Sequence, residues 1–319
     1  MPLLTDYLAR CEELLESGKP VVDVLWYLGD DCAHRPSEKS PFPVGFKYDY
    51  CTFDALSSRA SARDGRIVFP DGMSYSILWV PDGCFVNEAS VRRIEELESS
   101  GAHVVRGGLV DLERDLSRLV PDVVFDSSKS GDTDDFMWYH RQTPEEDIYF
   151  LATSSNNGYH GNVRFRAGGF SCQVAIPPAG SVFVRISQNG GKLEYQSHPQ
   201  LPDCLDKNVV RKRIRLLDCP MTTPYFLSPE QTFRTTLAFS ASDIQNGIVL
   251  DFGDERDVLD VRVNGRRVAK LWCPPYVCMI FPMAVVGENE IEVVRTGTWR
   301  KRLQYDRTLP AERRKTWTP

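Results

Sequence analysis

Residues 251–276 read DFGDERDVLDVRVNGRRVAKLWCPPY, with Asn264-Gly265 near the middle. Valine-rich runs flank the Asn-Gly pair on both sides, which is the strongest short-range signal of a β-hairpin, because both turn residues must adopt a positive φ. Trp272 and the pair Pro274-Pro275 come next. Proline has no N–H to donate, so the strand ladder should end before these residues.

The residues around this hairpin predict further strands. Ile291–Arg295 is a β-branched run introduced by Gly287. Two earlier runs of the same kind cover residues 231–239 and 247–252. Several short strands with turn residues between them indicate an all-β sandwich. We therefore expect a β-sandwich over residues 207–319.

The N-terminal half has a different pattern. Residues 1–20 place apolar side chains at helical spacing and predict an amphipathic helix. Val21–Leu28 is a nearly continuous apolar run, typical of a strand covered on both faces. Further strands are then predicted to alternate with helices, among them the helix 89–99. This alternation predicts a three-layer α/β domain with a parallel sheet, of flavodoxin-like or amidotransferase-like type, over residues 21–126.

A change of composition separates this domain from the next. Ser127 to Asp135 is dominated by serine, glycine, aspartate and lysine, which indicates a linker. Beyond it, five short strands separated by turn residues predict a small antiparallel β module over residues 136–190.

Composition restricts the function. The chain has 319 residues, a formal net charge of -6 and nine cysteines. The acidic balance gives no general attraction to nucleic acid or to anionic lipid. The cysteines form no CxxC pair and have no metal-ligand spacing, which is typical of reduced thiols in the cytosol. No signal peptide or membrane span is recognisable. We expect a cytoplasmic protein with no cofactor, no metal, and no nucleic-acid or membrane partner.

Five stretches, in one order, resemble glycoside hydrolase family 106, the α-L-rhamnosidase family. They are residues 7–31; 45–50 with 54–56; His140-Arg141 with 147–150; the hairpin above; and 298–303 with 309–310 and 316–317. The C-terminal sandwich is also similar to the sugar-binding domain of glycoside hydrolase family 2. The resemblance implies a galactose-binding-like sandwich and a glycoside hydrolase relationship, and it covers the region that follows the family's catalytic barrel.

Two departures from the family pattern bear on activity. The family's barrel carries the acid and base carboxylates and precedes the Tyr7 motif, whereas six residues precede that motif here. The family's Trp-x-Pro-x-Thr-Gly hairpin is not found around residues 168–178. No catalytic residue can therefore be carried over. Three hypotheses stay open: a non-catalytic accessory or scaffold region, a carbohydrate-binding protein, and a subunit of a split glycoside hydrolase. The expected partners are a carbohydrate, a separate catalytic chain or a second copy of this chain.

Two groups of residues are candidates for binding carbohydrate. Asp30, Asp31, Tyr48, Asp49 and Tyr50 are predicted near the carboxyl end of the first strand, where ligands bind to open α/β sheets. Carboxylates and aromatic faces suit a sugar, and glycoside hydrolysis needs two carboxyl groups about 5 to 10 Å apart. For the adjacent Asp30 and Asp31, we favour the alternative that they cap the following loop or packed against the missing barrel.

The second group belongs to the sandwich and comprises Asn264, Trp272 and Trp299. Aromatic side chains in such a domain can stack on sugar rings, but they more often close the core. For Trp272, beside two prolines, we expect burial.

Two other chemistries are weighed and not favoured. Cys84 follows a predicted strand, as a nucleophile in an amidotransferase-like sheet would, but it lacks the Gly-x-Cys-x-Gly elbow. Residues 130–135 carry three aspartates that resemble a calcium loop without the spacing of an EF-hand.

Overall fold

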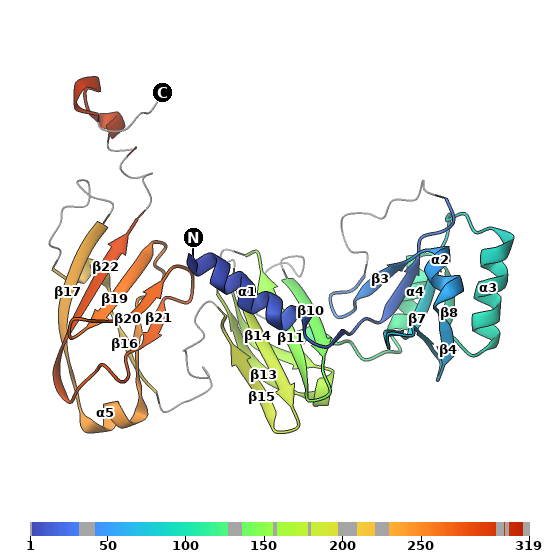
Figure 1. The fold of residues 1–319 in the computed structure, drawn as a ribbon, viewed down its shortest axis with the longest axis horizontal. Coiled ribbons are helices and arrows are strands. Elements are labelled where there is room, and N and C mark those ends of the chain that lie inside the picture. The colour runs from blue at the N-terminus through green and yellow to red at the C-terminus, as the bar shows by residue number, and fades with distance from the viewer. Residues whose placement is uncertain are drawn as a thin grey trace. The chain divides into compact units, whose positions relative to one another are not determined.

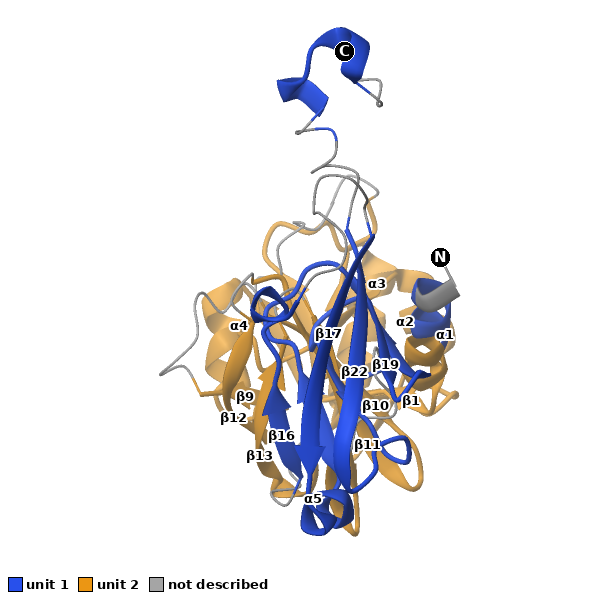
Figure 2. Cartoon of the chain, turned by 90° about the vertical axis from the view of Figure 1, so that its left-hand side faces the viewer, with its two compact units in different colours: residues 1–9, 193–319 blue, residues 10–192 orange. Residues whose placement is uncertain are grey.

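The computed structural model describes residues 2–31, 42–126, 136–155, 158–177, 180–196, 209–220, 230–297, 303 and 306–314. The chain forms two compact units, one of residues 1–9 and 193–319 and the other of residues 10–192 (Figure 2). The first helix, α1 (Pro2–Glu16), contributes residues to both. The predicted mixture of α/β and all-β structure is confirmed (Figure 1).

A four-stranded parallel sheet in the order β3-β2-β7-β8 forms the α/β layer of the unit of residues 10–192. Its strands are β2 (Val24–Tyr27), β3 (Tyr48–Cys51), β7 (Ile77–Pro81) and β8 (Val104–Gly107). Buried residues of α2 (Phe53–Ser58) and α3 (Glu88–Ser99) pack on one face, and those of α4 (Leu109–Leu116) pack on the other. A small antiparallel sheet lies beside it, with strands β4 (Ser61–Arg63), β5 (Arg66–Val68) and β6 (Ser74–Tyr75).

The apolar run Val21–Leu28 was expected to be one strand, and this prediction is wrong in extent. All four residues of β2 are buried, as a strand covered on both faces requires. The strand covers only Val24–Tyr27 of the run. The residues directly before the run, which the sequence placed in the N-terminal helical segment, form β1 (Lys19–Pro20), which pairs with an antiparallel strand of the other layer. Asp23 lies between β1 and β2, and its backbone oxygen accepts hydrogen bonds from the N–H groups of Ser76 and Ile77.

The antiparallel module of this unit consists of two sheets, ordered β1-β10-β11-β14-β15 and β13-β12-β9. Their strands are β9 (Val123–Phe125), β10 (Phe136–Gln142), β11 (Glu146–Thr153), β12 (Tyr159–Phe165), β13 (Ser171–Ile176), β14 (Ser181–Ser187) and β15 (Gly190–Glu194), in addition to β1. Tyr149 and Phe165 pack between the sheets, with ring centroids 4.7 Å apart. The five predicted strands are present as β10 to β14, and three further strands join them: β1 from the predicted helical segment, β9 from the predicted α/β domain, and β15, which the sequence reading missed.

The C-terminal unit contains two sheets, ordered β17-β22-β19-β20 and β16-β18-β21. Their strands are β16 (Val210–Arg213), β17 (Glu230–Phe239), β18 (Ile248–Asp251), β19 (Val258–Val263), β20 (Arg266–Leu271), β21 (Val277–Met279) and β22 (Gly287–Thr296). One apolar cluster, built from both sheets, forms the core. A short helix that the sequence reading missed, α5 (Ala241–Asn246), starts with a capping box of Ser240 and Asp243. Three short 3-10 helices complete the described elements: η2 (Ala167–Gly169), η3 (Leu216–Asp218) and η4 (Ala311–Arg313).

The predicted hairpin is present as β19 and β20. Val263 pairs with Arg266 across the turn, and the turn residues Asn264 and Gly265 have φ values of 52° and 76°. Two positive φ values match the right-handed twist of the flanking strands. β20 ends at Leu271, directly before the residues expected to end the ladder.

The six sheets of the described chain contain three to five strands each, and none of them closes into a barrel. Across the same residues, no helix is both long and apolar enough to span a bilayer.

Replacing Gly265 by alanine should destabilise the hairpin. A Cβ at this position would meet nothing within 4 Å, but φ is +76°, where an L side chain costs about 1 kcal/mol. The matched control is G297A, because Gly297 has no positive φ and its Cβ would lie at an ordinary 3.5 Å from Asp257. Urea denaturation should show a lower free energy of unfolding for G265A alone. Equal stability of the two variants would contradict this account.

Candidate functional site

Asp30 lies at the carboxyl end of β2 and is engaged in three hydrogen bonds. Its carboxylate accepts from the Tyr27 hydroxyl at 2.5 Å, the Ser90 hydroxyl at 2.8 Å and the Asn87 backbone N–H at 2.7 Å. Asn87 is the N-cap of α3, and its side chain accepts hydrogen bonds from the N–H groups of Ala89 and Ser90. Asp30 therefore fastens the end of β2 to the start of α3.

The adjacent aspartates have different surroundings, since Asp30 is half-buried and Asp31 is exposed. Burial by itself would raise the pKa of Asp30, but the hydrogen bonds from Tyr27, Asn87 and Ser90 outweigh it and lower the pKa. A carboxylate held ionised by three donors is poorly suited to be a general acid. The geometry of Asp30 thus fits the structural alternative.

Tyr48, Asp49 and Tyr50 lie in β3, where successive side chains point to opposite faces of the sheet. Tyr48 and Tyr50 pack on Trp26, with ring centroids 5.5 and 5.3 Å away. The Asp49 carboxylate accepts a hydrogen bond from the Tyr75 hydroxyl at 2.9 Å, and burial raises its pKa. β3 therefore directs the two tyrosine rings and the carboxylate to different faces.

A cavity of about 350 Å³ lies beside the start of β3. Its wall combines residues from the end of α1, from the link between β1 and β2, from β3 and from β10: Leu15, Pro20, Val21, Val22, Lys47, Tyr48, Asp49, Tyr139, His140 and Arg141. A mostly apolar and aromatic wall with a few polar groups is typical of ligand sites. Tyr48 and Asp49 are the predicted site residues that line it, whereas Asp30, Asp31 and Tyr50 do not.

Lys47 is a cavity residue that the sequence analysis missed. Its amino nitrogen lies 4.7 Å from the ring centroid of Trp138 and 5.1 Å from that of Tyr139. It forms no ion pair with any residue that the structure describes. Burial lowers the pKa of Lys47. The Arg141 guanidinium, in contrast, donates hydrogen bonds to the backbone oxygens of residues 16–18 at the end of α1.

The second predicted group does not assemble in the described part of the C-terminal unit. Trp299 lies outside the described residues. The Asn264 side chain is fixed by three hydrogen bonds with residues of the facing loop and of β22. Trp272 is half-buried rather than fully buried, and its ring meets that of Tyr7 edge-on at 5.7 Å. These contacts hold the hairpin and its neighbourhood in place.

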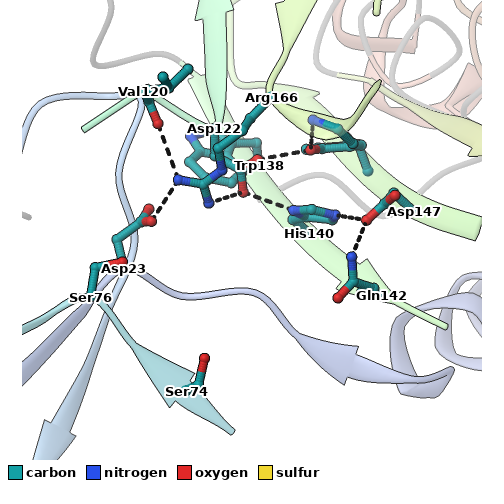
Figure 3. Close-up of polar contacts among 12 residues, drawn as sticks. Asp23, Ser74, Ser76, Val120, Asp122, Trp138, His140, Gln142, Asp147 and Arg166 are labelled. Carbon is teal, nitrogen blue, oxygen red and sulfur yellow. Dashed lines mark hydrogen bonds and ion pairs between the residues drawn. The ribbon is translucent and has the colours of Figure 1, made fainter. Parts of the chain in front are cut away.

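A buried ion network joins the α/β layer to the antiparallel module within the unit of residues 10–192 (Figure 3). Asp122 is fully buried and accepts hydrogen bonds from the Tyr149 hydroxyl and from His140 Nδ1, each at 2.8 Å. Arg166 lies 3.4 Å from the same carboxylate and donates to Asp23 Oδ1 at 2.7 Å. A buried carboxylate is stable only when charged or polar donors surround it, as here.

His140 contacts a carboxylate through each ring nitrogen: Nδ1 meets Asp122, and Nε2 lies 2.9 Å from Asp147. Only the protonated imidazolium can donate to both, because a neutral ring has a single N–H. Burial would lower the pKa of His140, but the hydrogen bonds and negative charges of the two aspartates outweigh it and raise the pKa. Sequence reasoning noted His140 within a motif and missed this pairing, because no spacing rule links it to Asp122.

Other chemistry finds little support in the described residues. No group of histidine, cysteine, aspartate and glutamate within them is arranged to hold a metal ion, and residues 130–135 lie outside them. Cys84 is half-buried, and burial, followed by nearby aspartates, raises the pKa of its thiol. A raised pKa disfavours the thiolate that a nucleophile needs.

Replacing Asp30 by alanine should test its structural role. D30A removes the acceptor of three hydrogen bonds and should lower the free energy of unfolding by about 1 to 3 kcal/mol. D31A should change it by less than about 0.5 kcal/mol, because the side chain is exposed. Urea denaturation of both variants provides the comparison. Equally small effects would show that Asp30 is not a fastening point.

His140 should make stability depend on pH. Because its folded pKa is raised, its contribution is complete below about pH 6.5, its ordinary pKa, and is lost as pH rises through the folded value. Asp147 has a lowered pKa, so its contribution is lost as pH falls below about 4.

The measurement is the free energy of unfolding between pH 6 and pH 9, followed for wild type and for H140Q. The decline above about pH 6.5 should be smaller in H140Q. H160Q is the matched control, because His160 is exposed on β12, and it should keep the wild-type slope. An unchanged slope in H140Q would contradict the pairing.

Several known proteins are similar to this chain in sequence or in fold. A family model described as alpha-L-rhamnosidase matches residues 1–111. The structure of a rhamnosidase from Novosphingobium sp. PP1Y is similar in fold, with a TM-score of 0.73 at 19% identity, over 99% of this chain and 38% of that one. A Formosa agariphila protein named "Putative beta-glucuronidase" is 27% identical over 211 residues, which cover 56% of this chain and 18% of that protein.

The chain therefore spans less than two fifths of either protein. The predicted resemblance to the α-L-rhamnosidase family is confirmed by these matches, and the chain is a glycoside hydrolase-like protein.

Proposed function

We propose that this chain forms a non-catalytic part of an α-L-rhamnosidase-like glycoside hydrolase. In this proposal the acid and base carboxylates come from a catalytic barrel outside the chain, either in a longer polypeptide or in a separate subunit. The fold likeness supports it, because almost the whole chain matches part of a rhamnosidase. The sheets of the described residues, none of which is a barrel, agree with it.

The observation that carries the proposal is the number of carboxyl groups in the cavity. Hydrolysis of a glycoside needs two, about 5 to 10 Å apart across the sugar. The wall described above contains one, Asp49, which is hydrogen-bonded to Tyr75. Asp30 does not line the cavity and is occupied by three donors. The cavity therefore has the shape of a binding site without an acid–base pair.

The finer description of the parts belongs to the same proposal. We assign the α/β layer to the flavodoxin-like or amidotransferase-like type on its parallel sheet with helices on both faces. We assign the C-terminal unit to the galactose-binding-like type on its two packed sheets. We propose a cytoplasmic location from the cysteine pattern, which has no CxxC pair and no metal-ligand spacing.

Carbohydrate binding is the second candidate function, and the cavity favours it. Its volume of about 350 Å³ is near the lower end of the range for small-molecule sites, about 300 to 1,000 Å³. The exposed ring of Tyr139 offers an apolar face for the C–H groups of a sugar, and its hydroxyl offers a hydrogen bond. A binding role needs no second carboxyl group.

Hydrolysis assays test the leading proposal. The purified chain should release no chromophore above the buffer blank from an aryl α-L-rhamnoside or an aryl β-D-glucuronide, because hydrolysis needs two carboxyl groups and the cavity wall contains one. D49N should behave as wild type does, and an active α-L-rhamnosidase serves as the positive control. Turnover by the wild-type chain that D49N abolishes would overturn the proposal.

A further inference from the structure

The cavity beside β3 contains the Lys47 cation, which no described residue neutralises through an ion pair. β1 pairs with β10 only at Arg141 and Gln142, so the edge of β10 at Trp138 and Tyr139 stays open to another segment. Lys47, directly before β3, occupies this position, and its amino group rests on the two aromatic faces. Aromatic faces stabilise a cation without cancelling its charge.

The other charged side chains in the cavity wall form hydrogen bonds within the protein. The Asp49 carboxylate keeps its charge when it accepts a hydrogen bond from the Tyr75 hydroxyl, but it points to the opposite face of the sheet from Tyr48. The His140 ring lies between two carboxylates of the buried network. The Arg141 guanidinium binds three backbone oxygens, which do not cancel its positive charge. The cavity therefore favours an anionic ligand.

The rest of the wall determines what kind of anion fits. Leu15, Val21 and Val22 are apolar, and Tyr139 is 57% exposed and open to a stacking partner. A small inorganic anion would leave these surfaces unused, whereas a sugar ring presents C–H faces to them. A volume of about 350 Å³ suits one ring or a short fragment rather than a long chain.

We propose that this cavity binds an acidic monosaccharide, with the sugar carboxylate on the Lys47 amino group and the pyranose ring against Tyr139. The proposal rests on the carbohydrate-binding function put forward above and specifies its ligand class. Lys47 then serves as the point charge that selects a uronate over a neutral sugar.

Isothermal titration calorimetry of the full chain tests this at pH 7 with D-glucuronate, L-rhamnose and inorganic phosphate. Glucuronate should bind saturably and at least about tenfold more tightly than the other two. K47M should lose about tenfold or more in affinity for glucuronate, because a truncated charge pair in a half-buried site costs at least that much. Y139A should also weaken binding.

Matched variants separate a lost charge from lost folding. K270M removes a lysine from the exposed face of β20 and should bind as wild type does. K47R keeps the charge and should retain most of the affinity. An unfolding transition of K47M in urea that matches the wild type excludes misfolding as the cause of its loss.

Three results would overturn the inference. Equal binding of rhamnose and glucuronate, unchanged in K47M, would refute the acidic ligand and leave carbohydrate binding standing. Phosphate binding as tightly as glucuronate would reveal an anion site without sugar preference. Saturable binding of none of the three probes would remove both this inference and the carbohydrate-binding candidate, without touching the non-catalytic proposal.

Discussion

The buried carboxylate of Asp122 is the interaction on which the unit of residues 10–192 depends. It has no access to solvent, and it receives donors from Tyr149, His140 and Arg166. An isolated buried charge would cost many kcal/mol, so these donors must be held in place for the unit to fold. Because Arg166 also binds Asp23 beside β2, the α/β layer and the antiparallel module become one body (Figure 3).

The cavity lies next to the buried network, because both use residues of β10. The network fixes His140 in β10, and the neighbouring residues Tyr139 and Arg141 then point to the other side of the strand and line the cavity. Arg141 donates hydrogen bonds to backbone oxygens at the end of α1. The amino group of Lys47 lies over the ring of Tyr139 at the open edge of β10. Side chains of the buried network and side chains that face the cavity thus alternate along this part of β10.

Several carboxylates of the described residues are engaged inside the fold. Asp30, Asp122 and Asp147 all accept hydrogen bonds from fixed donors. The cavity wall contains Lys47, whose amino group lies over the rings of Trp138 and Tyr139. The proposal of a binding role rather than a catalytic one agrees with this distribution, since proton transfer needs a carboxyl group with an adjustable protonation state.

The sequence by itself determined the local features. The Asn264-Gly265 turn, the prolines after Leu271 and the doubly buried β2 each follow from short-range backbone and patterning rules. Tertiary structure alone decided that Lys19-Pro20 joins the sheet of β10, that the Asp49 carboxylate meets the Tyr75 hydroxyl, and that Lys47 meets Tyr139. These outcomes depend on contacts between residues far apart in the chain, where each partner satisfies a buried or charged group that no local periodicity reveals.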